Sequence, residues 1–314
     1  MQMLYVLAGP TAVGKTAAAI QLAQAMNAEI LSADSVQIYQ GMDIGSAKPS
    51  LQERQGVPHH MMDIIPPGRE QPFTVAEYQR SAFACIEDIQ SRGKQVLVVG
   101  GTGLYIRSLC EVMDFSGART DEAFRQHWED AEAVQPGAAH AQLLRTDPQA
   151  AHTLHPNDKK RVIRALEINH MTGRTLAENR QKESRKQPRY ASVRVALNRE
   201  RQALYARIDQ RVELMLAQGL KEEVQGLLDA GVPRQATSMQ GIGYKEVVAW
   251  IDADITRQQA VERIQQASRR YAKRQWTWFR RDEHMRWFDV EAYPNVSALV
   301  AALLAHYQRG DQYV

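Results

Sequence analysis

Short continuous apolar runs alternate with amphipathic stretches through the first third of the chain. Continuous apolar runs are typical of parallel strands that are covered on both faces, and an apolar period of about 3.6 residues is typical of helices. We therefore predict strands at residues 3–8, 29–34, 95–99 and 192–197, and helices at residues 16–26 and 73–91, the second with an apolar stripe of Val75, Tyr78, Phe83 and Ile86. This order predicts an α/β fold, a parallel sheet flanked by helices.

The sequence GPTAVGKT joins the first predicted strand to the first predicted helix. It matches the P-loop pattern G-x-x-x-x-G-K-[ST] in the structural context that this motif requires. In such a loop, backbone N–H groups and the positive end of the helix face phosphate oxygens, Lys15 adds a charge, and the Thr16 hydroxyl can ligate Mg²⁺. A diphosphate or a triphosphate is expected to bind at Gly9, Pro10, Thr11, Ala12, Val13, Gly14, Lys15 and Thr16. The motif leaves the choice between the two ligands open.

Two further strand ends carry candidate chemistry. Asp34 ends the second predicted strand, and the carboxyl ends of parallel strands meet at the ligand-binding edge of a sheet, so Asp34 is expected beside the P-loop. An acid in this position is hydrated, paired or functional, and we favour a functional role. The third strand runs into Gly100-Gly101-Thr102-Gly103, which offers N–H donors and space but no acid. The missing acid argues against an ordinary ATPase.

The pattern changes after about residue 113, where polar helical stretches follow. We predict a P-loop NTPase-like domain made of residues 1–114 and 190–314, with residues 115–189 as a helical insertion domain. Residues 201–228 are predicted to form one helix, because Leu204, Ile208, Val212 and Met215 recur on one face. The helix that starts at residue 159 is predicted to turn Val162, Ile163, Leu166 and Asn169 inward.

Charge is distributed unevenly along this chain of 314 residues, whose net charge is +3. Residues 159–189 contain ten Lys or Arg against three Glu, and residues 257–286 contain nine against three acids. Between residues 260 and 281 the basic side chains alternate with aromatic ones, which suits the phosphates and exposed bases of RNA. Two basic segments on an otherwise acidic chain predict a polyanionic partner larger than a nucleotide. The plainer alternative is that both are solvated helix faces.

Cysteine usage and hydropathy indicate the compartment. Cys85 and Cys110 are too few for a disulfide framework or a four-cysteine metal site, which favours a reducing cytoplasm. The apolar N-terminal run is too short for a signal peptide and lacks its basic flank, and no stretch is long enough to span a membrane. Zinc is not expected at His59-His60, because adjacent side chains project in different directions.

Several separated stretches match one family. They are GPTAVGKT (9–16), SADSVQIY (32–39), GMDIGSAKP (41–49), VPHH (57–60), VGGTGLY (99–105), HPND (155–158) with RVIRALE (161–167), GIGY (241–244) and KRQWTWFR (273–280). In this order they resemble the bacterial tRNA dimethylallyltransferases, the tRNA isopentenyltransferases of the IPP transferase family. A lone P-loop is shared by many families, but this set is specific and extends over almost the whole chain. Ile242 and Trp276 stand where other aliphatic residues are frequent, and residues 120–153 match only loosely.

The resemblance implies a prenyltransferase that moves a dimethylallyl group from dimethylallyl diphosphate to N6 of the adenosine immediately 3′ of the anticodon in tRNA, releasing diphosphate. It implies Mg²⁺ as the cofactor, with Thr16 as a ligand, and a P-loop that binds this diphosphate rather than ATP. Lys15 and Thr16 would stabilise the leaving group, Asp34 would accept the N6 proton, and Thr102 would line the channel shared by donor and adenine. The family also uses an Arg on the diphosphate, which Arg207 and Arg211 match equally well.

The partner implied by the resemblance is the anticodon stem-loop of tRNA, bound by a protein expected to be a cytoplasmic monomer. The insertion domain would contact this tRNA. The positions that match the family's tRNA-facing segments are Asp34, Ser35, Val36, Gln37, Thr102, Arg125, Lys160, Arg161, Val162, Ile163, Arg164, Gln240, Gly241, Ile242, Gly243, Tyr244, Lys245, Lys273, Arg274, Gln275, Trp276, Thr277, Trp278, Phe279 and Arg280.

Three alternatives remain at the level of sequence. An adenylate isopentenyltransferase acting on free AMP, ADP or ATP would share the P-loop but would have no use for two basic segments. A P-loop kinase would bind ATP, and the missing acid after the third strand argues against it. A non-catalytic RNA-binding protein would need the basic segments but not Asp34 beside a P-loop.

Overall fold

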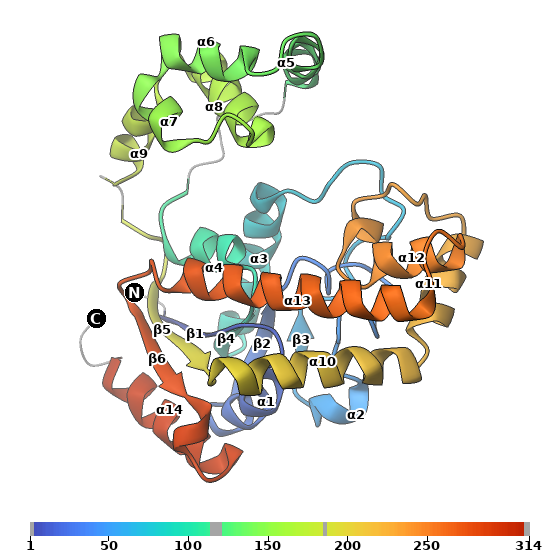
Figure 1. Cartoon of the computed structure of the whole chain (residues 1–314). Helices are drawn as coiled ribbons and strands as arrows, with labels where there is room; N and C mark the ends of the chain where they lie inside the picture. The colour runs from blue at the N-terminus through green and yellow to red at the C-terminus, as the bar shows by residue number, and fades with distance from the viewer. Residues whose placement is uncertain (1–2, 114–120, 185–186, 311–314) are drawn as a thin grey trace. The chain divides into compact units, whose positions relative to one another are not determined.

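In the computed structural model, which describes residues 3–113, 121–184 and 187–310, six parallel strands of these residues form one sheet in the order β3-β2-β4-β1-β5-β6 (Figure 1). The four predicted strands are confirmed. Two strands were not predicted, β3 because it has only two residues and β6 because its sequence, MRWFD, contains no continuous apolar run. The strands are β1 (Met3–Ala8), β2 (Ala28–Ala33), β3 (His59–His60), β4 (Gln95–Gly100), β5 (Ala191–Asn198) and β6 (Met285–Asp289).

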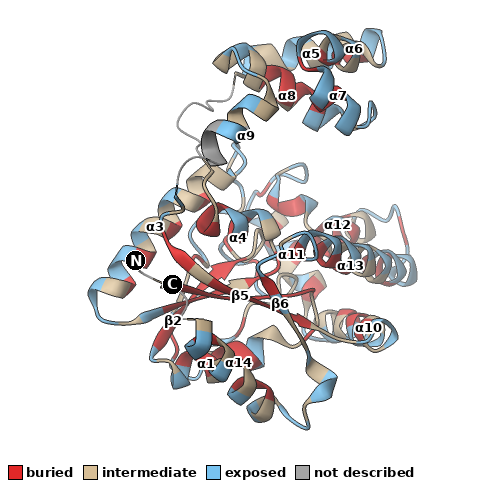
Figure 2. Cartoon of the chain, turned by 90° about the vertical axis from the view of Figure 1, so that its left-hand side faces the viewer, coloured by how far each residue is buried: buried red, intermediate tan, exposed pale blue. Residues whose placement is uncertain are grey.

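Side chains that alternate along β1 belong to two different apolar clusters, one on each face of the sheet. The burial colours of Figure 2 show that the strands are mostly buried between the helices. Tyr5 and Leu7 belong to the layer with α1 (Lys15–Ala25) and α14 (Val296–Gly310). Leu4 and Val6 belong to the layer with α3 (Val75–Ser91) and α4 (Gly103–Cys110). Because both faces of the sheet are covered, its strands read as continuous apolar runs.

The apolar stripe of α3 differs in part from the prediction. Tyr78 and Ile86 are buried as expected, and Ala82 and Ile89 complete the buried stripe at helical spacing. Val75 and Phe83 are half-buried at its border. The helix begins with a capping box in which the Thr74 hydroxyl accepts from the backbone N–H of Glu77.

The prediction of one helix at residues 201–228 is wrong, because these residues form two helices. Gly219 adopts φ 103°, a conformation that ends α10 (Arg201–Ala217) and starts α11 (Leu220–Asp229) in a new direction. Leu204, Ile208 and Val212 are buried as predicted, whereas Met215 is half-buried. The other helical elements of this region are α2 (Leu51–Arg54), η1 (Ser238–Gln240), α12 (Tyr244–Ile251), α13 (Arg257–Phe279) and η2 (Val290–Ala292).

By its internal contacts the chain divides into two units, Met1–Cys110 with Tyr190–Val314, and Glu111–Arg189. The predicted start of the insertion at residue 115 lies outside the described residues. Val162, Ile163 and Leu166 enter the second unit's own core, while Asn169 is half-buried. Spanning a bilayer takes a longer and more apolar helix than any in the described residues. The second unit's helices are α5 (Glu122–Val134), α6 (Ala138–Thr146), α7 (Pro148–Thr153), α8 (Lys159–Thr172) and α9 (Leu176–Ser184).

Close packing of β4 against β2 gives a test of the sheet. A Cβ atom at Gly100 would lie 2.1 Å from the backbone oxygen of Ala33, and neither strand can yield easily. We expect Gly100→Ala to lower the free energy of unfolding by about 1–3 kcal/mol, the usual cost of overpacking. Gly226→Ala is the matched control, since Gly226 lies inside α11 with open space around it, and alanine should raise stability there by about 0.5–1 kcal/mol. Urea denaturation measures both, and a Gly100→Ala variant as stable as Gly226→Ala would contradict this packing.

Candidate active site

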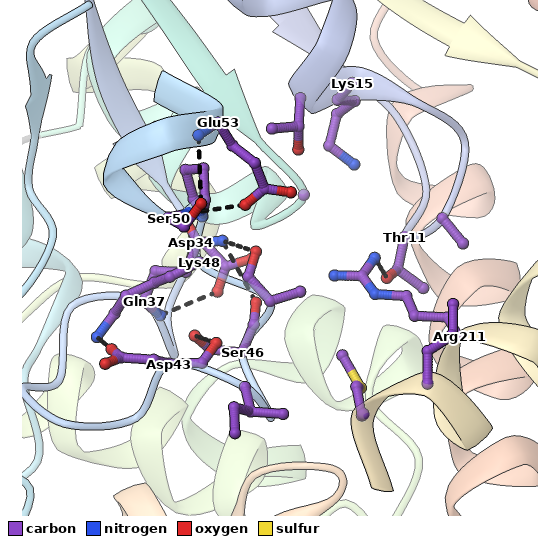
Figure 3. A pocket seen from close by; sticks show the side chains of 18 of the residues that line it. Thr11, Lys15, Asp34, Gln37, Asp43, Ser46, Lys48, Ser50, Glu53 and Arg211 are labelled. Atoms are coloured by element: carbon purple, nitrogen blue, oxygen red, sulfur yellow. Dashed lines mark hydrogen bonds and ion pairs between the residues drawn. The ribbon is translucent and has the colours of Figure 1, made fainter. Parts of the chain in front are cut away.

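The carboxyl ends of the central strands open into a cavity of about 840 Å³ (Figure 3). Thr11 comes from the loop after β1, Lys15 from the start of α1, Asp34 from the end of β2, and Gly101 from the turn after β4. Helices α10 and α13 and the segment between residues 43 and 54 complete the lining. The prediction that Asp34 lies near the P-loop is therefore confirmed, because parallel strands bring these segments to one edge.

The phosphate loop is anchored from α13. The buried Gln275 accepts a hydrogen bond from the backbone N–H of Thr11 at 2.9 Å through Oε1, and its Nε2 donates to the carbonyl of Gly101 at 3.0 Å. One amide therefore joins the loop after β1 to the turn after β4. Gln275 was predicted to face tRNA, but its side chain is committed to this internal bridge.

Lys15 is the cation of the loop. Its Nζ donates to the carbonyl oxygens of Gly9 and Pro10, each at 2.8 Å. Desolvation by the surrounding protein, followed by the charge of Arg211, lowers the pKa of Lys15 to about 7, while Asp34 acts in the opposite direction. Lys15 is thus close to its point of half-protonation at neutral pH.

Both candidate arginines lie at the loop. Arg207 donates from Nε to the carbonyl of Ala12 at 3.0 Å and is exposed. Arg211 is half-buried and donates to Thr11 Oγ1 at 3.3 Å. Desolvation, with a smaller contribution from Arg207, lowers the pKa of Arg211, and the charge of Asp34 opposes this. Both line the cavity, and Arg211 is the one whose charge acts directly on Lys15.

Asp34 is oriented by the backbone that follows it. Its Oδ1 accepts from the N–H groups of Val36 at 2.9 Å and Gln37 at 3.4 Å, the geometry of an Asx turn. Among the described residues none donates to the second carboxylate oxygen, Oδ2. Asp34 therefore presents a fixed acceptor to a cavity that Lys15 and Arg211 also line.

Thr102 departs from its prediction. Its Oγ1 accepts from the N–H of Ser35 at 3.0 Å, and its own N–H donates to the carbonyl of Ala33 at 3.0 Å. The lining includes Gly101 but not Thr102, so Thr102 joins the segments behind the wall. Tyr271, missed in the sequence because it reads as a core aromatic, lines the cavity, and burial raises its pKa to about 12 despite a hydrogen bond with Thr102.

Oxygen donors at the loop fit Mg²⁺, which prefers carboxylates, hydroxyls and phosphate oxygens. Thr16 lines the cavity together with Asp34, Asp43 and Glu53. In the described residues no group of three or more His, Cys, Asp or Glu side chains could hold a metal ion. A cation here would therefore share the oxygens of a bound phosphate.

His60, at which zinc was not expected, contacts a carboxylate instead. Its Nε2 lies 2.6 Å from Oε2 of the buried Glu29.

Burial corrects the predicted tRNA surface. Five of the predicted side chains lie in apolar clusters and have almost no surface to offer a partner; they are Val162, Ile163, Tyr244, Trp276 and Phe279. The indole Nε1 of Trp276 donates to Asn198 Oδ1 at 3.0 Å, and the backbone of Gly243 is also buried. The exposed members of the prediction are Lys160, Arg161, Gln240, Lys245, Lys273, Arg274, Thr277, Trp278 and Arg280.

Two predicted arginines of the second unit are held internally. Arg125 contacts both carboxylate oxygens of Glu167 at 2.9 and 2.8 Å, and Arg164 pairs with the same group. Glu167 is fully buried, and these bonds lower its pKa against the effect of desolvation. Five further positions of the predicted tRNA surface, which belong to the first unit, are half-buried; they are Ser35, Val36, Gln37, Gly241 and Ile242.

Comparison with known proteins identifies relatives over almost the whole chain. The family model described as IPP transferase matches residues 37–282. The tRNA dimethylallyltransferase of Bacillus subtilis (strain 168) is 48% identical over 291 residues, covering 92% of this chain and 91% of the relative. The solved tRNA isopentenylpyrophosphate transferase of Bacillus halodurans is 37% identical with a TM-score of 0.73, covering 100% of this chain and 99% of its own. A eukaryotic dimethylallyltransferase acting on tRNA is 31% identical with a TM-score of 0.80, covering 92% and 74%.

The low pKa of Lys15 predicts that anion binding is coupled to proton uptake. At pH 8, above the pKa of about 7, Lys15 is mostly neutral, and a bound polyanion should restore its proton. Binding of inorganic diphosphate should therefore be accompanied by proton uptake at Lys15 in the wild type. In Lys15→Arg this uptake should be smaller by up to about one proton per site, because arginine is always charged. At pH 6 the difference should shrink. Calorimetry in buffers of different ionisation enthalpy measures this, and equal uptake at pH 8 would show that Lys15 is already charged.

Proposed function

The chain belongs to the IPP transferase family, and from this premise we propose that it transfers a dimethylallyl group from dimethylallyl diphosphate to N6 of the adenosine immediately 3′ of the anticodon in tRNA, releasing diphosphate. One observation supports this most: a P-loop and a fixed carboxylate, Asp34, line the same cavity. The turn after β4 contains Gly100, Gly101, Thr102 and Gly103 and supplies no acid of the kind that phosphoryl transfer uses.

In the proposed mechanism the loop amides, Lys15 and Arg211 bind the diphosphate and stabilise the charge that develops as the allylic C–O bond breaks. Mg²⁺, held by Thr16 and the phosphates, would add Lewis-acid stabilisation of that charge. Adenine N6 is a weak nucleophile because its lone pair is delocalised into the ring. Asp34 orients the amine and accepts its proton. The adenine must leave its stack for its N6 to reach Asp34 inside the cavity.

The proposed acceptor site is the exposed basic face of α13, with Lys273, Arg274 and Arg280, and the turn at residues 240–243. The insertion, predicted as residues 115–189, is proposed to contact the anticodon stem-loop through Lys160 and Arg161. Arg125 and Arg164 would act from the fixed positions that Glu167 gives them. We further propose a cytoplasmic monomer, since none of these roles requires a second chain.

Mass spectrometry of tRNA tests the proposal. With dimethylallyl diphosphate and Mg²⁺, and with no ATP present, tRNA should gain the mass of one dimethylallyl group, and Lys15→Ala should abolish the gain. ATP-dependent transfer of phosphate to an acceptor would contradict the proposal and would indicate a kinase. Transfer to free AMP in preference to tRNA would favour the adenylate isopentenyltransferases.

Asp34→Asn separates the base from the binding site. The variant should keep its fold and its affinity for the diphosphate but lose ~10²-fold or more in prenyl transfer, the usual scale for a positioned base. Asp254→Asn, at an exposed position outside the cavity, is the control and should behave as the wild type. Near wild-type turnover of Asp34→Asn would remove this carboxylate from the mechanism.

The basic face of α13 is tested by Arg274→Ala combined with Arg280→Ala. If both side chains contact phosphates, tRNA binding should weaken, and its salt dependence should fall by ~0.7–0.9 log units for each phosphate that is no longer neutralised. Affinity for dimethylallyl diphosphate should not change. The control pair Arg80→Ala with Arg309→Ala removes the same charge from α3 and α14. Identical binding curves for the two pairs would mean that these arginines are solvated and do not touch the tRNA.

A further inference from the structure

One wall of the cavity is held from outside by a single carboxylate. The segment from Asp43 to Ser46 lines the cavity, and behind it Glu223 of α11 accepts three hydrogen bonds from successive backbone N–H groups. These donors are the N–H groups of Asp43 at 2.9 Å, Ile44 at 2.7 Å and Gly45 at 3.1 Å. Successive N–H groups that converge in this way form a nest that binds an anion. Here a side chain of the protein occupies the nest.

Tyr244 orients this carboxylate. It is fully buried, and its hydroxyl donates to Glu223 Oε1 at 2.8 Å. Burial, and next the negative charge of Glu223, raise the pKa of Tyr244 far above its ordinary value, so the hydroxyl remains a donor. A Cβ atom at Gly45 would lie 2.6 Å from the Tyr244 ring, so glycine allows the wall to lie directly on the tyrosine.

The inner side of the same wall has its own supports. Lys48 donates to the carbonyl of Tyr39 at 2.7 Å and pairs with Asp43 at 2.7 Å and with Asp63 at 2.5 Å. Gln37 Nε2 donates to the carbonyls of Ser46 and Ala47, each at 3.3 Å. These contacts tie the wall to the segment after β2, which carries Asp34. The remaining support, at residues 43–45, comes from Glu223.

We propose that Glu223 is a positioning residue for the donor diphosphate site, acting through the backbone of residues 43–45, with Tyr244 as the group that orients it. The proposal rests on the proposed function, since the wall lines the cavity in which the phosphate loop would hold the donor. Glu223 touches neither Asp34 nor the phosphate loop. Its loss should therefore alter the shape of the site and leave the proton transfer in place.

Steady-state prenyl transfer to tRNA tests this with Glu223→Gln, which keeps the shape of the side chain but turns an N–H donor toward the nest. The KM for dimethylallyl diphosphate should rise ~10-fold while kcat changes less than ~3-fold, the pattern of lost ground-state binding. Tyr244→Phe should raise the same KM by a smaller factor. Glu222→Gln, the exposed neighbour on α11, is the matched control and should leave KM unchanged.

A merely structural role predicts a different result. Lower melting temperatures with an unchanged KM in both Glu223→Gln and Tyr244→Phe would overturn the proposal, as would equal KM values for Glu223→Gln and Glu222→Gln. If Glu223→Gln does not fold, Tyr244→Phe decides, because it removes one hydroxyl and keeps the ring. Wild type and Glu222→Gln report on the activity itself. If neither of them modifies tRNA, the proposed function is wrong. This outcome is distinct from a failure of the proposal for Glu223.

Discussion

Two cations held close together at the end of β1 are the constraint on which the site depends. Burial lowers the pKa of both Lys15 and Arg211, and the charge of Arg211 lowers the pKa of Lys15 further. The negative charge of Asp34 acts in the opposite direction on both pKa values. A bound polyanion would take over that part from Asp34 and would leave the carboxylate free to act on an acceptor. In the proposed mechanism the carboxylate would therefore have two successive partners within one cavity. The usual pKa of Lys15 is 10.5, so the unfolded chain holds more protons here than the folded one between about pH 7 and 10.5, and stability rises with pH in that window.

The parallel sheet is what allows such a concentration of charge. Each strand delivers one kind of group to the same edge: amides and Lys15 after β1, a carboxylate after β2, and a glycine turn after β4. Helices α10 and α13 pack together and add Arg211 and Gln275 from the opposite side.

The elements that could be predicted from sequence are those with a local signal. Continuous apolar runs identified four strands, and the Gly-Lys-Thr pattern with the acid after β2 identified the centre of the site. The break at Gly219 could not be predicted, because the apolar period continues across it and only the backbone angle reveals the turn. The roles of Glu223, Gln275 and Glu167 were also missed. Each of these side chains binds atoms far away in sequence, and a polar residue on a helix gives no local sign of that.

The bridge made by Gln275 has a consequence for how this sequence can change. A Cβ atom at Gly101 would lie 2.1 Å from Nε2 of Gln275, so any larger residue at position 101 collides with the amide that holds Thr11. A shorter residue at position 275 would make room but would release the phosphate loop. The two positions are therefore epistatic: neither single step is neutral, and drift must cross a less active intermediate to change them both. A position on α13, 174 residues from its partner, is thereby tied to the history of a glycine in the turn after β4.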